Sequence, residues 1–177
     1  MTPSTIIDLP FGPVLITEQK DEQDCHACRG YIGIHYLSEH NGSFQLRKSW
    51  PEAIEGSGWG KPPSVWRVTK EFTAYPAIYT ETGYMYQGDS GEDAGITELQ
   101  PDQPVTSESV DLGLSNEGNY EQVGKPLCRY SGKIVRIEKD RSFAVLFKGS
   151  VTGEDRYAKR GGKFIGVAQA VRGAACT

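Results

Sequence analysis

Two cysteines at positions 25 and 28 have the spacing best suited to chemistry in this chain. Residues 25–28 read Cys-His-Ala-Cys, and thiols three positions apart can form a disulfide, supply half of a zinc site or cycle as a redox pair. Haem attachment is excluded, because it requires a histidine directly after the second cysteine and Arg29 stands there. A metal- or thiol-dependent domain built on Cys25 and Cys28 is therefore one alternative function.

A structural disulfide fits these two cysteines better than the reactive roles. Zinc needs two further ligands, usually a second close pair, but Cys128 and Cys176 are far apart in the sequence. A redox pair should open a helix, whereas residues 30–34 continue into β structure. We predict that all four cysteines form disulfides, with the first bridge either inside residues 25–28 or from them to Cys128 or Cys176.

Three carboxylates lie close together between Gly88 and Gly95, namely Asp89, Glu92 and Asp93. Carboxylate oxygens can bind Ca²⁺, but the spacing does not match an EF-hand loop, so calcium stays an open alternative to a plain exposed turn. No serine, histidine and acid have the context of a catalytic set. We therefore expect no enzymatic activity, no cofactor and no resident metal.

Aromatic residues are concentrated between positions 50 and 86, where Trp59, Tyr84 and Tyr86 are among three tryptophans and several tyrosines. Such side chains can stack on sugars or anchor a protein interface, although most become core residues or cross-strand pairs. A carbohydrate-binding module is therefore a second alternative function.

Charge is unevenly distributed along the chain. The net charge is −4, which gives no support to a nucleic-acid partner. Between Tyr86 and Leu127 there are nine acidic residues and one basic residue, Lys125, whereas basic residues are frequent from Arg129 to Lys163. The acidic segment is expected either to dock near complementary strands of its own fold or to meet a basic partner.

The elements that must position these residues are short strands. Apolar alternation and turn residues predict strands at residues 6–9, 14–17, 31–37, 43–47, 64–69, 77–80, 84–87, 96–99, 110–114, 133–138, 143–147 and 163–167. Asn41-Gly42 predicts a hairpin turn, because both residues accept positive φ. Residues 50–55 read as a helical turn.

The chain has 177 residues, which fits one domain with a full core. We predict a single all-β domain over residues 1–177, an antiparallel β-sandwich or barrel, with a loop-rich acidic region at 88–127. No apolar run is long enough to span a bilayer. No signal peptide is visible at residues 1–5, yet the Gly-rich β character and even cysteine number favour a periplasmic or secreted location.

Three stretches carry a resemblance to uncharacterised exported bacterial β-proteins: residues 25–34, the Gly-Trp-Gly at 58–60, and residues 128–134. In size and β content the chain is also similar to small periplasmic immunity proteins and lysozyme inhibitors. The resemblance implies an exported β-protein and transfers no functional residue.

The combined expectation is a binding protein, an immunity or inhibitor protein that inserts an acidic loop into the basic cleft of a toxin or cell-wall hydrolase. Asp89, Glu92 and Asp93 would supply the charge, with Trp59, Tyr84 and Tyr86 as anchors.

Overall fold

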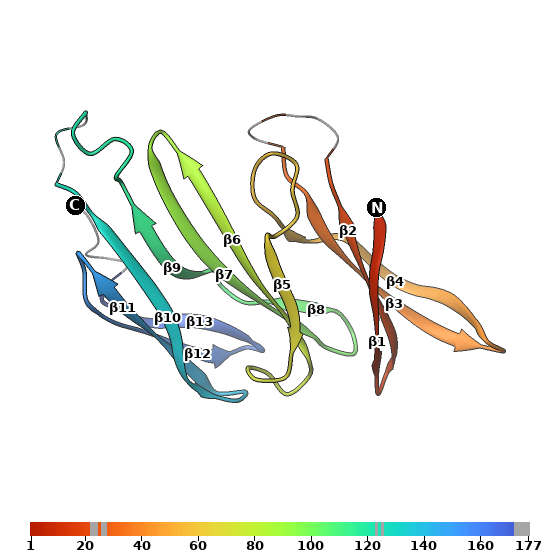
Figure 1. Ribbon diagram of the computed structural model, residues 1–177. Helices are drawn as coiled ribbons and strands as arrows, with labels where there is room; N and C mark the ends of the chain where they lie inside the picture. Colours follow the sequence, from red (N-terminus) through yellow and green to blue (C-terminus); the bar gives the residue numbers. More distant parts are fainter. Residues whose placement is uncertain (22–24, 26–27, 123, 125, 172–177) are drawn as a thin grey trace. The chain divides into compact units, whose positions relative to one another are not determined.

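The computed structural model describes residues 1–21, 25, 28–122, 124 and 126–171. They are built almost entirely from antiparallel β-strands, as predicted, in two sheets (Figure 1). The chain divides into two compact units, residues 1–64 (unit 1) and 65–177 (unit 2). The single domain over 1–177 stays a prediction. The described residues contain no helix long and apolar enough to cross a lipid bilayer.

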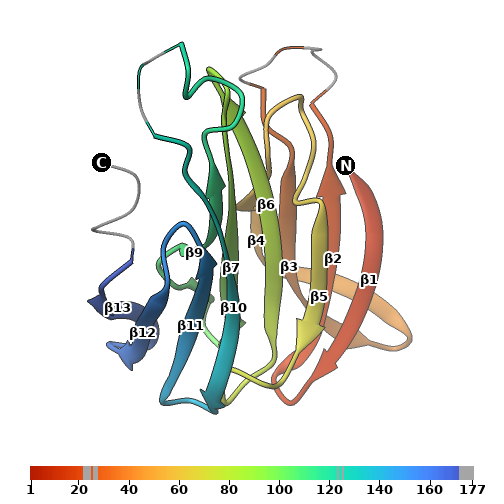
Figure 2. The ribbon, with the colours of Figure 1, turned by 60° about the vertical axis from the view of Figure 1, so that its left-hand side comes forward.

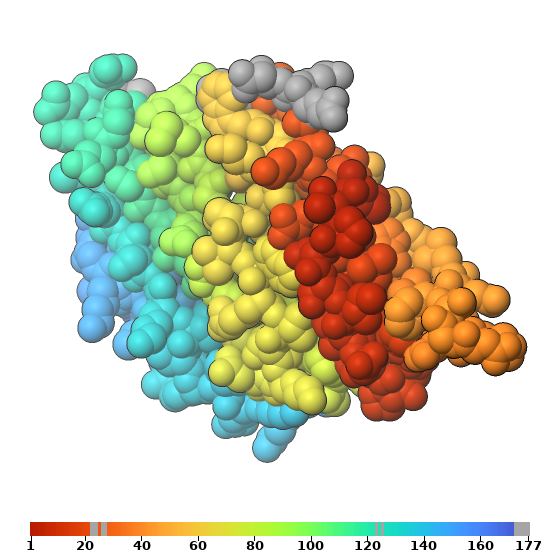
Figure 3. Space-filling model, turned by 45° about the vertical axis from the view of Figure 1, so that its right-hand side comes forward, coloured from red at the N-terminus to blue at the C-terminus, as the bar shows by residue number. Residues whose placement is uncertain are grey.

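Unit 1 is a four-stranded meander in which each strand pairs with the next along the chain. Its strands are β1 (Thr2–Leu9), β2 (Gly12–Gln19), β3 (Tyr31–His40) and β4 (Ser43–Glu55). The predicted turn between β3 and β4 is confirmed: Asn41 and Gly42 have φ values of 52° and 74°. Residues 43–49 of β4 are exposed, and Figure 3 shows this end of the hairpin in orange, standing out from β1 in red.

One face of this sheet is apolar because alternate positions of β2 and β3 carry large aliphatic or aromatic side chains. Cross-strand pairing places Val14 beside Tyr36 and Ile16 beside Ile34, and all four are buried. The ring of Tyr36 contacts Trp50 edge-on, with 5.0 Å between centroids. The opposite face carries Gly33 and the polar residues Thr17, His35 and Ser49.

The helical turn expected at residues 50–55 is wrong, because these residues continue β4. Trp50 pairs with Ile34 and Ile54 with Ile32. Positions four apart share a face in a strand as well as in a helix, so the spacing of these residues did not decide between the two. Pro51 is tolerated because β4 lies at the sheet edge, where a missing N–H breaks no ladder.

Unit 2 contains the second sheet, in the order β13-β12-β11-β10-β9-β7-β6-β5, with β8 on β7. Its strands are β5 (Val65–Thr69), β6 (Ala77–Tyr86), β7 (Asp89–Leu99), β8 (Pro104–Thr106), β9 (Val110–Ser115), β10 (Arg129–Glu138), β11 (Ser142–Gly149), β12 (Gly153–Arg160) and β13 (Lys163–Gln169). Figure 2 shows β12 and β13 turning away from β11 at one end of this sheet.

The sheet of unit 2 curls until β13 meets the segment that follows β8. The backbone N–H of Glu108 donates to the carbonyl of Phe164 (3.0 Å), and the N–H of Phe164 donates to Ser107 Oγ (3.0 Å). The curled sheet encloses an aromatic core in which Phe143 stacks on Tyr157 at 4.8 Å and meets Phe164 edge-on at 5.1 Å. Within unit 2 the architecture is therefore that of a partly closed barrel.

The loop-rich region expected at 88–127 is wrong for much of its length. β7 occupies eleven residues of it and pairs with β6 on one side and with β8 and β9 on the other. The first half of β7 is acidic and Gly-containing, a composition of low strand propensity, and pairing on both sides overrides that propensity.

Candidate functional site

The predicted acidic residues lie on a hairpin strand, β7, rather than in a loop. The turn between β6 and β7 consists of Gln87 and Gly88, with φ values of 50° and 87°, the two positive values of a tight hairpin turn. Asp89 pairs with Tyr86 at the end of the hairpin, and Asp93 pairs with Thr82. Alternation places Asp89 and Asp93 on one face of β7 and Glu92 on the other.

Three consecutive large side chains are exposed on β6 at the end of this hairpin. Tyr84, Met85 and Tyr86 have exposed fractions of 47%, 75% and 68%. The ring of Tyr84 lies across Gly91 of β7, because a Cβ built at Gly91 would overlap that ring. The hairpin therefore presents apolar area that its own strands leave in contact with water.

The loop between β9 and β10 packs against the turn and extends this surface. The N–H of Gly118 donates to the carbonyl of Gly88 (3.2 Å), and the Asn119 side chain donates to the carbonyl of Gln87. The base of the loop is fixed by the buried Asn116, whose side chain accepts from the N–H of Cys128 (2.8 Å). The loop thus adds Glu117, Tyr120 and Glu121 to the end of the hairpin.

We define the aromatic–acidic tip by these residues: Tyr84, Met85, Tyr86, Asp89, Glu92, Glu117, Tyr120 and Glu121. Hydrogen bonding from the Tyr120 hydroxyl to Glu121 raises the pKa of this tyrosine, so it stays a neutral donor. Of the residues predicted to bind a partner, five lie on this hairpin. The sixth, Trp59, belongs to unit 1, where it is half-exposed and has a φ of 65°.

Several acids of the segment 88–127 are occupied inside unit 2. Asp111 accepts the hydroxyl of the buried Tyr130 (2.7 Å), and Glu108 accepts the N–H of Gly166 (2.9 Å). Glu117 lies 3.6 Å from Arg129. Asp89 and Glu92 form no ion pair with a described residue, so their charge is directed to solvent or to a partner.

The calcium alternative finds no support in the described part of the chain. No group of three or more His, Cys, Asp or Glu side chains among those residues is arranged to hold a metal ion. For Asp89, Glu92 and Asp93 the reason is the alternation of β7, which divides the three carboxylates between two faces.

The cysteines at 25 and 28 are bonded to each other, which is one of the pairings that the sequence left open. Their Cα atoms are 5.2 Å apart, and the N–H of Cys28 donates to the carbonyl of Cys25 (3.1 Å). Cys28 accepts the N–H of Gly60 (2.8 Å), so the bridged segment also holds the loop that carries Trp59. Cys128 is disulfide-bonded as well, and Cys176 lies outside the described residues.

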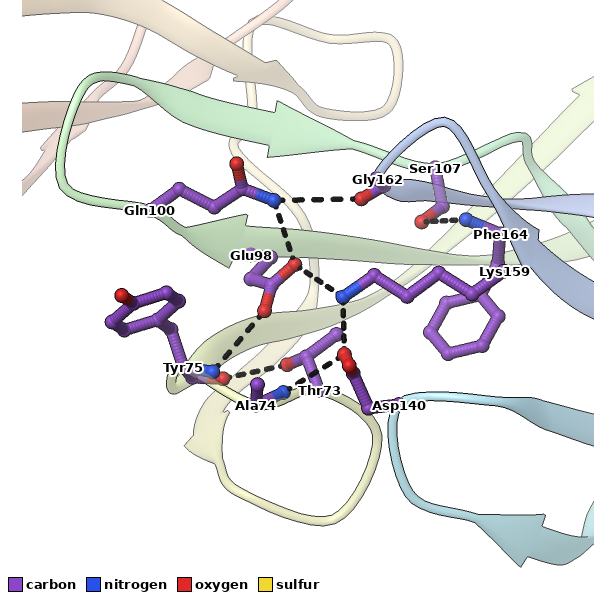
Figure 4. A network of polar contacts seen from close by, with 10 residues as sticks. All are labelled: Thr73, Ala74, Tyr75, Glu98, Gln100, Ser107, Asp140, Lys159, Gly162 and Phe164. Carbon is purple, nitrogen blue, oxygen red and sulfur yellow. Dashed lines mark hydrogen bonds and ion pairs between the residues drawn. The ribbon is translucent and has the colours of Figure 1, made fainter.

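A buried ion-pair network closes one end of unit 2 (Figure 4). Lys159 Nζ on β12 lies 2.8 Å from Glu98 Oε2 on β7 and also contacts Asp140 Oδ1 in the turn between β10 and β11. Glu98 accepts from the N–H of Tyr75 (3.1 Å) and from the Gln100 amide (2.9 Å). Both carboxylate oxygens of Glu98 are therefore satisfied. The network joins β7 to β12, two strands that are not neighbours in the sheet.

A cleft of about 260 Å³ opens in unit 2 above Phe72, Tyr79 and Leu112. Part of its charged rim is engaged internally: the guanidinium of Arg67 lies 4.2 Å from the centre of the Tyr79 ring, and the Tyr79 hydroxyl donates to Glu81 (2.8 Å). The volume lies below the roughly 300–1,000 Å³ usual for small-molecule sites, so we assign no ligand to this cleft.

Unit 1 has a hydrogen-bonded cluster of polar side chains on the face opposite its apolar residues. His35 Nε2 lies 3.0 Å from Thr17 Oγ1, and His35 Nδ1 lies 2.8 Å from Ser49 Oγ. Burial lowers the pKa of His35, so the ring is neutral at pH 7. No carboxylate of a described residue forms a hydrogen bond or ion pair with this ring, and hydroxyl groups on both sides satisfy its two nitrogens.

Sequence reasoning missed Met85, Glu117, Tyr120 and Glu121 as site residues, and it placed Lys159 within the basic stretch from Arg129 to Lys163. The tip residues come together only through docking of the loop on the hairpin turn, for which the sequence offers no local pattern. No protein-family model, no curated protein and no solved structure matches this chain. The resemblance to exported bacterial β-proteins therefore stays a prediction.

Proposed function

We propose that this chain is an exported binding protein that inhibits a partner enzyme through the aromatic–acidic tip. The observation that carries the proposal is the run of exposed side chains at Tyr84, Met85 and Tyr86, on the same hairpin as the carboxylates of Asp89 and Glu92. Aromatic side chains and methionine are enriched in the cores of protein interfaces, and carboxylates at the rim steer a basic partner into place.

The tip suits binding because its conformation is fixed by hydrogen bonds within the chain, without a partner. A two-residue turn fixes the hairpin, Gly118 and Asn119 are hydrogen-bonded to that turn, and Asn116 is hydrogen-bonded to Cys128, directly before β10. A surface of this kind loses little conformational entropy on binding, which favours affinity. The partner class that fits is a basic enzyme with an open cleft, such as a cell-wall hydrolase or a basic toxin.

The proposal is tested with a panel of basic peptidoglycan hydrolases that includes a lysozyme, an amidase and a lytic transglycosylase. We expect the full chain to inhibit at least one of them and to bind it less tightly as salt is raised. Tyr84→Ala with Tyr86→Ala should weaken binding by about 100-fold or more, because two hot-spot aromatics are removed. Asp89→Asn with Glu92→Gln should mainly slow association.

Matched controls lie on unit 1. Phe44 and Leu46 are as exposed as the tip residues, so Phe44→Ser with Leu46→Ser removes comparable apolar area elsewhere. Glu39→Gln with Glu52→Gln removes the same charge as the acidic tip pair. Equal inhibition by the tip variants and the controls would contradict a role for the tip, and no inhibition across the panel would contradict the inhibitor role.

A further inference from the structure

The side chains of Lys159 and Asp140 form an ion pair at one end of unit 2 (Figure 4). The Lys159 side chain has an exposed fraction of 14%, and its amine contacts carboxylate oxygens of both Asp140 and Glu98. Glu98 is almost fully buried, at 3%. An amine, a carboxyl group in contact with it and a second carboxylate on the same nitrogen are the groups that an intramolecular amide bond requires.

Backbone hydrogen bonds fix both reacting groups. The N–H of Lys159 donates to the carbonyl of Arg141 (2.8 Å), which sets β12 beside the turn that carries Asp140. In that turn Asp140 has a φ of 62°, and its N–H donates to the carbonyl of Phe72 (2.7 Å). Its carboxylate accepts the N–H of Ala74 (3.1 Å). The amine and the carboxyl group are therefore oriented before any reaction takes place.

Aromatic residues flank the two groups. Phe164 pairs with Lys159 across β12 and β13, and Phe143 contacts both Phe164 (5.1 Å) and Phe72 (5.7 Å). All three rings are buried. The Lys159 side chain is 14% exposed, whereas the Asp140 side chain is 44% exposed and leaves a departing water a path to solvent.

We propose that Lys159 and Asp140 condense to an amide bond between Nζ and Cγ, with Glu98 as the proton carrier. One proton moves from the ammonium group through Glu98 to the Asp140 carboxylate. The neutral amine then attacks Cγ and the N–C bond forms. A second proton passes from nitrogen through Glu98 to the hydroxyl group, the C–O bond breaks, and one water leaves. An ammonium and a carboxylate thus give an amide and water, and Glu98 ends in its starting state.

The ion pair opposes the first proton transfer and makes the reaction slow. Burial works to lower the pKa of Lys159, but hydrogen bonds to Asp140 and Glu98 outweigh it and leave this pKa above its ordinary value. The hydrogen bond from Lys159 in turn lowers the pKa of Asp140. Against this stands the fixed geometry, since oriented groups in one molecule reach effective concentrations of about 10⁵–10⁸ M. One turnover per chain is sufficient.

The mass of the full chain, denatured with its cysteines reduced and alkylated, tests the proposal. We expect the wild-type protein to be lighter than its sequence by one water, and digestion to yield a branched peptide that joins Lys159 to Asp140. Lys159→Arg keeps the positive charge but should have its full calculated mass. Glu98→Gln should retain its full mass or lose water much more slowly, whereas Lys148→Arg, at an exposed position, should lose water like the wild type.

Each other outcome overturns the proposal. A wild-type chain of full calculated mass would mean an ion pair only. A water loss that persists in Lys159→Arg would indicate another dehydration, such as a cyclised aspartate, and a branch at Glu98 would assign the bond to a different carboxyl group. These results do not depend on partner binding, so they leave the proposed function of the tip to its own test.

Discussion

At the scale of single residues, His35 shows how a missing side chain makes room for a polar one. Its ring leans over Gly33, and a Cβ at Gly33 would lie 2.9 Å from His35 Nε2. In this position the ring links Thr17 on β2 and Ser49 on β4, the two strands that flank its own. Both hydroxyls can donate to or accept from a neutral ring, which makes the neutral form the one that fits.

The titration of His35 should make the stability of the protein depend on pH. Its pKa is lower in the folded chain than in the unfolded chain, so the stabilisation is complete above about pH 6.5. As pH falls from there through the folded-state pKa, the unfolded chain takes up a proton first and the free energy of unfolding decreases. Denaturant titrations at pH 8 and pH 5 measure this loss.

His35→Gln should reduce the pH dependence, and His40→Gln, at the exposed end of β3, is the matched control. An identical loss of stability in wild type and His35→Gln would show that other groups cause it.

Gly33 itself supplies a second prediction at this scale. Gly33→Ala should lower the free energy of unfolding by about 1–3 kcal/mol, because the new methyl group overlaps Thr17, His35 and the carbonyl of Pro51. Gly83→Ala is the matched control, since the nearest atom to its Cβ is 3.7 Å away and its φ is not positive. Equal denaturation midpoints for the two variants would contradict the steric account.

At the scale of elements, tight turns decide where strands meet. Among the hairpin turns of the described residues, three carry paired positive φ values: Asn41-Gly42, Gln87-Gly88 and Gly161-Gly162. The first was predicted from its sequence, because Asn-Gly is a strong hairpin signal. Gln87-Gly88 was not, because glutamine lacks the short side chain that makes asparagine tolerant of positive φ. Here the pairing of β6 with β7 imposes the conformation on the turn.

Gly88→Ala should therefore cost more than Gly42→Ala. A methyl group at Gly42 meets open space, so the cost is the positive φ alone, about 1 kcal/mol. At Gly88 it would also meet Gly118 and Asn119 within 2.9 Å, which adds about 1–2 kcal/mol and displaces the loop of the tip. Equal losses in denaturant titrations would mean that the loop does not rest on the turn.

At the scale of the whole molecule, every described cysteine is oxidised, which fits an exported protein. We expect alkylation in denaturant without reductant, followed by peptide mapping, to leave Cys25, Cys28 and Cys128 unlabelled. Cys25→Ser with Cys28→Ser should lower the free energy of unfolding by at most about 2 kcal/mol, because the bridge closes only a short loop. Labelling of both cysteines with bound zinc would favour the metal-dependent alternative.

The sequence by itself determined the strand-rich class, most of the strand positions and the Asn-Gly hairpin, and it indicated a disulfide at residues 25–28 without its pairing. These are local properties, which the alternation of apolar residues and the turn residues indicate. It did not reveal β12, because Asp155 occupies an inward position there and accepts the N–H of Val171 (2.9 Å), which interrupts the apolar alternation.

Tertiary structure alone decided the two sites that carry the proposals. Lys159 meets Glu98 across 61 positions of sequence and Asp140 across 19, and the curl of the sheet brings these groups together. The tip likewise forms because the loop after β9 reaches back to the turn between β6 and β7. The physical reason is the same in both: burial and hydrogen bonding between distant segments depend on which strands pair, and residue spacing does not encode that pairing.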